Sequence, residues 1–186
     1  MTGSAPATGK RTTVSVAAQL ALAIAVFLAA SPVAPAQDGG CALVQDNRNP
    51  NEKILRCGEA LVIRVAPGTV YRLIPGPGSR QPSGARLDSG ALMIELDRSK
   101  TKRTFQIQTP HAIAAVRGTT WAVEVKPEQT STFVVADVVT VTRANRSNAV
   151  VLNAGEGVDV TAGRGPLTVK VWSEDRARTL LGRFGQ

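Results

Sequence analysis

Most of this chain is a succession of short runs of β-branched and other apolar residues, separated by turn-forming residues. Several runs alternate apolar and polar side chains with a period of two, which indicates strands with one buried face. Gly, Pro, Asn and Asp cluster between the runs, and these residues favour turns. Strands this brief at such regular spacing predict an all-β fold, either a solenoid-like stack of short antiparallel strands or a sandwich. The runs are KILRC (53–57), ALVIRV (60–65), TVYRLI (69–74), ALMIEL (91–96), RTFQIQ (103–108), AIAAV (112–116), TTWAVEV (119–125), STFVV (131–135), VVTVT (138–142), AVVLN (149–153), GVDVT (157–161) and LTVKV (167–171).

Only the C-terminal segment has helical periodicity. Ser173 suits an N-cap position, and Glu174 and Asp175 suit the positive end of a helix dipole. Apolar residues then recur at helical spacing, so the predicted helix is amphipathic. Because so short a helix is not stable alone in water, its apolar face should dock on the chain's own strands or on a partner protein. That face consists of Ala177, Leu180, Leu181 and Phe184.

The N-terminal segment has the features of an export signal. Lys10 and Arg11 precede an apolar run at 14–30, and the small-x-small motif of a signal-peptidase site follows at 34–36. The run is shorter than the ~20 apolar residues of a spanning helix. We therefore expect cleavage between Ala36 and Gln37 and a periplasmic or secreted protein. An uncleaved anchor that keeps the chain at the inner membrane is the alternative.

The predicted organisation of the sequence has four parts. We expect a signal peptide at 1–36, an irregular lead-in at 37–59, a β-domain at 60–172 and the C-terminal helix at 173–186. Losing two of the 22 basic residues leaves 20 against 14 acidic ones, a net charge of +6. Outside the cytoplasm, such a charge meets lipid head groups and envelope polymers rather than nucleic acid.

The densest basic cluster is RSKTKR, residues 98–103. It contains no aromatic side chain on which a base could stack, so a nucleic-acid partner is not expected. One hypothesis makes it a solvated hairpin tip that keeps the sheet soluble. The other makes it a site for an anionic polymer of the envelope, formed by Arg98, Lys100, Lys102 and Arg103.

The chain has two cysteines, Cys41 and Cys57. In an oxidising compartment, a pair this close in sequence predicts a disulfide. The alternatives are weaker. A lipoprotein site needs an apolar residue three positions before the cysteine, where Asp38 stands, and a metal site needs more ligands than two cysteines and a distant histidine supply.

The sequence offers no recognisable catalytic constellation. His111 is the only histidine, no serine lies in a G-x-S-x-G elbow, and the expected disulfide removes the free thiols. Neither a metal centre nor another cofactor is indicated, and we expect the protein not to be an enzyme. Carboxylates stand mostly on the polar sides of strands, and no spacing singles out a pair among Glu95, Asp97, Glu124, Asp137, Glu156 and Asp159.

The stretch TPHAIAAVRGTTWAVEV, residues 109–125, raises the question of an active site, because it places the histidine six residues before Arg117. Pro110 lacks an amide donor and should end the preceding strand. Gly118 gives the backbone freedom at a tight corner between two strands. The alternation places Trp121 on the core face. We therefore interpret the stretch as a corner. Arg117 would either act as a clasp, which binds turn carbonyls or one carboxylate, or form an anion site.

Several motifs in the same order resemble the FecR family, which is named for the periplasmic regulator of ferric-citrate uptake. They are a T-P-…-V-R-G-T-x-[FW]-x-V core, a threonine-led strand, a hairpin and a V-x-L-x-x-G-E-G motif. An upstream strand pair, GARLDSGALMIEL, fits as well, so the resemblance covers roughly residues 60–161. The matching residues are Thr109, Pro110, Val116, Arg117, Gly118, Thr119, Trp121, Val123, Thr130, Leu152, Gly155, Glu156 and Gly157.

The resemblance implies an all-β stack of short strands and a habit of protein or surface interaction outside the cytoplasm. Asp137 stands where the family usually has Gly, and Asp tolerates turn geometry better than most residues. Full regulators of the family also carry an anti-sigma segment, a membrane span and a transporter-docking module. We expect none of these here, and so we do not carry over the regulation of a sigma factor.

The expected function is that of an exported, non-enzymatic FecR-like module that binds an envelope protein or polymer in signalling or scaffolding. The candidate contacts are the strand faces and edges and the helix face formed by Leu180, Leu181 and Phe184. One alternative is a binder of anionic envelope polymer through residues 98–103, and another is a signalling regulator anchored in the inner membrane. Exposed strand edges would also allow self-association.

Overall fold

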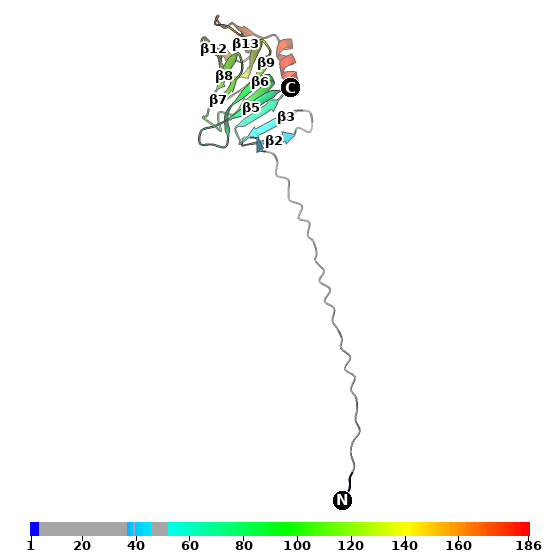
Figure 1. The fold of residues 1–186 in the computed structure, drawn as a ribbon. Coiled ribbons are helices and arrows are strands. Elements are labelled where there is room, and N and C mark those ends of the chain that lie inside the picture. The colour runs from blue at the N-terminus through cyan, green and yellow to red at the C-terminus, as the bar shows by residue number, and fades with distance from the viewer. Residues whose placement is uncertain (4–36, 39, 46–51) are drawn as a thin grey trace. The chain divides into compact units, whose positions relative to one another are not determined.

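The strands of the protein form one sheet that folds over into two layers and nearly closes on itself. The computed structural model describes residues 1–3, 37–38, 40–45 and 52–186. The expected signal peptide therefore lies almost entirely outside the described residues. All the strands belong to the unit Ala34–Gln186, and the all-β prediction is confirmed (Figure 1).

The first layer, layer A, runs in the order β1-β2-β3-β4-β6-β9-β10-β13-β14. The second, layer B, runs β5-β6-β7-β8-β11-β12, so the long strand β6 belongs to both. Pairing is antiparallel except between β6 and β7. The bounds are β1 Gln37–Asp38, β2 Cys41–Gln45, β3 Lys53–Cys57, β4 Leu61–Val65, β5 Val70–Pro75, β6 Pro82–Leu96, β7 Phe105–Gln108, β8 Ala112–Val116, β9 Thr119–Lys126, β10 Gln129–Ala136, β11 Val138–Arg143, β12 Ala149–Asn153, β13 Glu156–Thr161 and β14 Val169–Val171.

The short passages between the two layers share a backbone feature. In each of them one residue has a positive φ, which lets the chain turn sharply enough to leave one layer and enter the other. At four of the passages this residue is glycine, and at the fifth it is Asp137 with φ 60°. The predicted tolerance of Asp137 for turn geometry is therefore confirmed. The glycines are Gly68, Gly90, Gly118 and Gly155.

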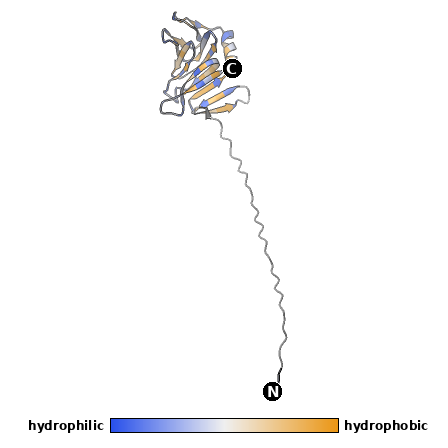
Figure 2. Cartoon of the chain, viewed as in Figure 1, coloured by the Kyte–Doolittle hydropathy of each residue, from blue (hydrophilic) through white to orange (hydrophobic). Residues whose placement is uncertain are grey.

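The main hydrophobic core fills the space between the layers. Alternating residues of both layers point into it, which is the physical consequence of the period-two pattern in the sequence. Hydrophobic and hydrophilic residues are interspersed along the strands (Figure 2). Trp121 is fully buried there, as the alternation predicts. Its largest fully buried members include Trp121, Phe105, Leu55, Ile63, Leu87, Leu92, Ile94, Ile107 and Leu152.

A second, smaller core lies on the opposite face of layer A. The helix α1, Glu174–Leu181, and the 3₁₀ turn η1, Gly182–Phe184, cover this face (Figure 1). Layer A is therefore buried on both sides near the helix, which explains why Ala122 is fully buried although it alternates with Trp121. The residues of this core are Ala66, Ala91, Met93, Ala122, Phe133, Trp172, Leu180 and Phe184.

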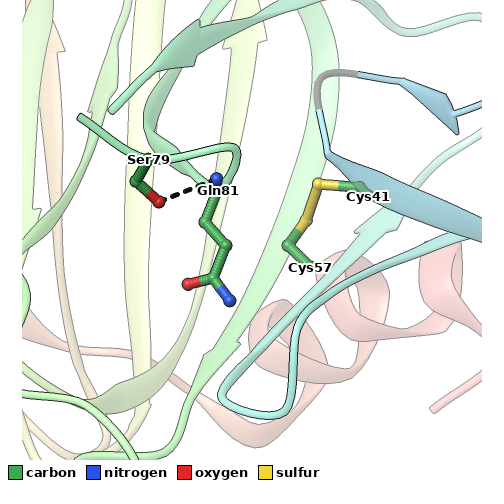
Figure 3. The surroundings of a disulfide bond; sticks show 4 residues. All are labelled: Cys41, Cys57, Ser79 and Gln81. Carbon is green, nitrogen blue, oxygen red and sulfur yellow. Dashed lines mark hydrogen bonds between the residues drawn. A yellow bond between two sulfur atoms is a disulfide. The ribbon is translucent and has the colours of Figure 1, made fainter. Parts of the chain in front are cut away.

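The predicted disulfide is present at the edge of layer A. Cys41 of β2 and Cys57 of β3 are both buried, with their Cα atoms 4.1 Å apart (Figure 3). The loop that contains Ser79 and Gln81 lies over this hairpin, and Gln81 donates its backbone N–H to the Ser79 hydroxyl at 3.0 Å. A Cβ atom on Gly58, the residue after β3, would stand 2.0 Å from the side-chain Nε2 atom of Gln81, so the loop and the end of the hairpin are in direct contact.

Two segments differ from what the sequence pattern predicts. We expected the lead-in to be irregular before KILRC, but its described part forms β1 and β2, which continue layer A by pairing with β3. The strand pair that the family resemblance implies in GARLDSGALMIEL is instead one continuous strand, β6, because Gly90 bends the strand from layer B into layer A without breaking the ladder.

Candidate functional site

The structure separates the two residues that suggested an active site. His111 precedes the start of β8, and Arg117 follows its end. A strand rises about 3.3 Å per residue, so the backbone positions of the two residues lie roughly 20 Å apart, beyond opposite ends of β8. They do not form a catalytic pair, and the stretch is a corner.

The residues at the start of β8 form a small hydrogen-bond network. The Thr109 hydroxyl accepts the Ala112 N–H at 2.8 Å and lies 2.9 Å from the Thr130 hydroxyl, which comes from the other layer. The His111 Nδ1 atom lies 3.2 Å from the same Thr130 hydroxyl. Thr109 and Thr130 are buried, and Pro110 is exposed at the turn. The network ties β8 to β10, so these residues serve the architecture.

Gly118 and Thr119 build the corner at the other end of β8. Gly118 has φ 124°, and a Cβ atom there would stand 2.2 Å from the Cβ of Arg98, far inside contact distance. The Thr119 hydroxyl donates a hydrogen bond to the Ala136 carbonyl oxygen. These contacts join three passages between the layers, the ones at 98, 118 and 136–137.

Arg117 does not act as a clasp. Its side chain is exposed and makes no hydrogen bond or ion pair within the described part of the chain. That role belongs to Arg143, which is 7% exposed and donates to the carbonyl oxygens of Gly165 at 2.8 Å and Thr161 at 2.7 Å. Arg143 was not predicted from the sequence, although the pattern of β11 places it on the same inward face as Val139 and Val141.

The basic segment 98–103 is not a hairpin tip. It crosses from layer A back to layer B, because β7 pairs in parallel with the first half of β6. The Asp97 N–H donates to the Ala60 carbonyl oxygen at 2.8 Å, and Asp97 accepts hydrogen bonds from the Ser99 hydroxyl and N–H. The Ser99 hydrogen bonds lower the pKa of Asp97 below its usual value. The start of the segment is therefore tied to the sandwich through Asp97, while its basic side chains are exposed.

Two of its four basic side chains meet Arg117 at a pocket of about 290 Å³, here called the corner pocket. Arg98, Thr101, Lys102 and Arg117 line it. Arg98 also lies 3.7 Å from the Asp137 carboxylate. The other two cations lie elsewhere, since Lys100 pairs with Asp97 at 3.6 Å and Arg103 lines a much smaller cavity beside Phe105.

The apolar face of the C-terminal helix is occupied by the chain's own sheet. Leu180 is 4% exposed, Phe184 is fully buried, and Leu181 is half-buried. The Ser173 hydroxyl caps the helix by accepting the Arg176 N–H, as predicted. Of the two alternatives for this face, docking on the β-domain is the one observed, so a partner would have to displace the helix to reach it.

Polar contacts fasten this helix to layer A. The guanidinium of Arg176 stacks on Trp172 at 3.7 Å from the ring centroid and donates to Asp159 at 2.6 Å. Burial raises the pKa of the Asp159 carboxyl, but hydrogen bonds from Arg176 and Ser131 outweigh it and lower that pKa below its usual value. Arg183 pairs with Glu124 in the same region. Gly157 leaves room for Trp172, because a Cβ atom there would stand 2.3 Å from the indole nitrogen.

The acidic residues that could have formed a catalytic pair are committed to separate partners. Each of the six accepts a hydrogen bond or forms an ion pair with a different neighbour, and no two of the six share a partner. Arg64 does bridge Glu95 to a carboxylate outside this set, Glu52, at 2.8 and 3.1 Å. Within the described ranges, no group of three or more potential metal ligands lies together. The pairs are Glu95–Arg64, Asp97–Ser99, Glu124–Arg183, Asp137–Arg98, Glu156–Asn153 and Asp159–Arg176.

The two-layered β-architecture and the corner motif define a class of all-β domain. In this class the motif residues form the tight connections through which the chain crosses from one layer to the other. Residues 58–140 match the family model described as FecR protein, so the chain carries a FecR domain. The matched segment contains the corner at Arg117–Thr119, the corner pocket and Asp137. It ends within β11, before the V-x-L-x-x-G-E-G motif.

Solved structures share the fold. Two crystal structures of a protein described as a "putative anti-sigma factor" from Parabacteroides distasonis ATCC 8503 superpose on this chain with a TM-score of 0.53, at 18% and 17% sequence identity. The superposition covers 80% of this chain and 63% of theirs. A comparison with curated proteins found no significant match. No helix in the described part of the chain combines the length and apolarity that crossing a bilayer requires.

Proposed function

We propose that the protein is an exported, non-enzymatic FecR-domain module that binds another component of the cell envelope in signalling or scaffolding. The observation that carries this proposal is the FecR domain at residues 58–140. The shared fold with a protein described as an anti-sigma factor adds support for a role in signalling. The export signal deduced from the sequence supports a location in the periplasm or outside the cell.

The pairing of the six candidate carboxylates with other side chains favours a binding function over catalysis. An acid–base pair needs two groups that converge on one substrate, whereas here the six candidate carboxylates are held by different cations or polar side chains. The FecR domain also points to a regulatory rather than an enzymatic role. A binding module with this architecture would act through its exposed edges and faces.

Photo-crosslinking in living cells tests the proposal. A photoreactive amino acid at Val138 would probe the edge that carries the corner pocket, and one at Arg72 would probe the exposed outer face of β5 as the matched control. We expect a reproducible crosslinked envelope component from one position and not from the other. Equal, diffuse crosslinking from both positions, or none from either, would refute a specific binding module.

A signalling regulator anchored at the inner membrane is the second candidate, favoured by the apolar run at 14–30. The N-terminus of the protein from the cell envelope distinguishes the two. A chain that begins at Gln37 supports an exported module, and a chain that retains Lys10 and Arg11 and sediments with the inner membrane supports the anchored regulator.

A further inference from the structure

The corner pocket brings together cations that are far apart in the sequence. Arg98 and Lys102 come from the crossing segment between β6 and β7, and Arg117 comes from the end of β8. They meet because Gly118 lets the backbone of Arg98 approach so closely that a Cβ atom would overlap it. Without glycine at this corner, the two arginines would be held further apart.

Arg117 differs from several other cations of the fold, which already have a carboxylate partner. Arg64, Arg86, Arg176, Arg178 and Arg183 each pair with a carboxylate. Arg117 and Lys102 have no such partner within the described residues, and both are exposed on the pocket. Two donors of fixed charge are therefore available to a ligand.

The charge of the lining selects the class of ligand. Arg98, Lys102 and Arg117 contribute three positive charges, and Asp137 beside Arg98 contributes one negative charge, which leaves +2. Lys100 and Asp97 pair with each other and add none. A carboxylate would neutralise half of this charge, whereas the dianion of a phosphate monoester would neutralise all of it.

The donors of the lining also fit such a dianion. Two guanidinium forks can bind oxygen atoms in pairs, the ammonium of Lys102 supplies a point charge, and the Thr101 hydroxyl supplies one more donor. A phosphate monoester presents three terminal oxygens to accept them. The pocket, about 290 Å³ in volume, also leaves room for part of the group that carries the phosphate.

We propose that the corner pocket, lined by Arg98, Thr101, Lys102 and Arg117, binds a phosphate monoester displayed by an envelope glycan or lipid. This inference deepens the proposed binding function and rests on it, because it names the chemistry that one exposed site of the module recognises. It replaces the cluster of four basic residues expected from the sequence by a set that includes Arg117 and omits Lys100 and Arg103.

Calorimetric titration of the exported chain with glucose 1-phosphate tests the site. We expect saturable binding that R117Q and K102Q each weaken by roughly tenfold, or about 1.4 kcal/mol, since each removes a charged hydrogen-bond donor. R117K, which keeps the charge but loses the fork, should lie between wild type and R117Q. The matched control R72Q removes an exposed arginine away from the pocket and should change the affinity less than twofold.

Three further readouts separate recognition from general attraction. The affinity for the monoester should rise as the pH increases through about 6, where the monoester becomes a dianion. A phosphodiester, which stays a monoanion, should show no such rise and should bind more weakly than the monoester above about pH 6. R117Q should leave the thermal midpoint of unfolding unchanged, because its side chain makes no hydrogen bond or ion pair in the described part of the chain. Equal losses in R72Q and R117Q, or equal binding of diester and monoester, would overturn the proposal.

Vesicles identify the source of the group. Binding to phosphatidic acid but not to phosphatidylglycerol, with loss in R117Q, would support a lipid-borne monoester. Binding of the sugar phosphate alone would support a glycan. Absence of both would overturn the site. The two proposals can fail separately. If the protein binds the phosphate monoester but gives no specific crosslink in cells, the proposed binding module is refuted and the phosphate site stands. If it gives a specific crosslink but binds no phosphate monoester, the site is refuted and the binding module stands.

Discussion

Replacing Gly118 with alanine is the most direct test of how the corner is built. Gly118 has φ 124°, and its missing Cβ would stand 2.2 Å from the Cβ of Arg98 and 3.0 Å from the Cα of Arg98. The obstacle is close to the backbone rather than at the end of a flexible side chain. The corner must therefore open if a methyl group is added.

The magnitude follows from three contributions, two that destabilise and one that offsets them. An alanine held at this φ, outside the left-handed helical region, costs about 1–3 kcal/mol. Moving the overlapping groups to ordinary contact adds a cost of about 1–3 kcal/mol, typical of overpacked sites. Alanine also reduces the entropy of the unfolded chain, which offsets about 0.4–1 kcal/mol. We expect G118A to lower the free energy of unfolding by about 2–4 kcal/mol.

The chain offers a matched control in Gly163. Its φ is 125°, almost the same as at Gly118, but no heavy atom lies within 4 Å of the position that a Cβ atom would occupy there. G163A therefore carries the backbone strain and the entropy effect without the overlap. The difference between the two variants isolates the contact between the corner and Arg98.

Urea unfolding at neutral pH with the disulfide intact measures both variants, and thermal unfolding checks them. G118A should be less stable than G163A by about 1–3 kcal/mol, or roughly 3–10 °C in thermal midpoint for a domain of this size. Equal destabilisation by the two substitutions would mean that the close approach of Arg98 does not require glycine, and the account of the corner would be wrong.

Three further predictions concern the disulfide, the helix and the other corner. Removing the bond between Cys41 and Cys57, which are 16 residues apart, by a double alanine substitution should lower the free energy of unfolding by about 3 kcal/mol, and unchanged urea midpoints would contradict this. The depressed pKa of Asp159 means that its stabilising effect is complete above the unfolded-state pKa near 4 and is lost as the pH falls through the lower folded-state pKa. D159N should therefore flatten the decline of the urea midpoint below about pH 4; an identical pH profile would show that the carboxylate does not carry the effect. At Asp137, with φ 60°, glycine should leave the free energy of unfolding within about 1 kcal/mol of wild type, while valine should cost about 1–2 kcal/mol or more, and equal effects would refute the strain argument.

Local chemistry in the sequence was sufficient for most of the strands, the helix cap and the disulfide. Period-two alternation marks the strands because a half-buried strand exposes every second side chain to water. Ser173 marks the start of the helix because its hydroxyl satisfies an amide that the helix leaves unpaired. These signals need only neighbouring residues, and so they can be recognised without the fold.

The sequence could not show which face of a strand would be covered twice. Ala122 and Glu124 look alike in an alternation pattern, yet the first is fully buried and the second pairs with Arg183 of the C-terminal turn. The helix that distinguishes them lies about 50 residues further along the chain. The roles of Arg143 and Arg117 were likewise undecided, because a cation becomes a clasp or an open donor only through the carbonyls and carboxylates that the fold brings to it.

The sequence by itself determined that this chain forms an all-β FecR domain with turns at several glycines and at Asp137, because backbone conformation and alternation are local properties. Only the tertiary structure decided that Arg98, Lys102 and Arg117 share one pocket. Their meeting depends on a parallel crossing between β6 and β7 and on the close approach at Gly118. Such contacts between distant segments are fixed by packing of the two layers, and no neighbouring residue in the chain encodes them.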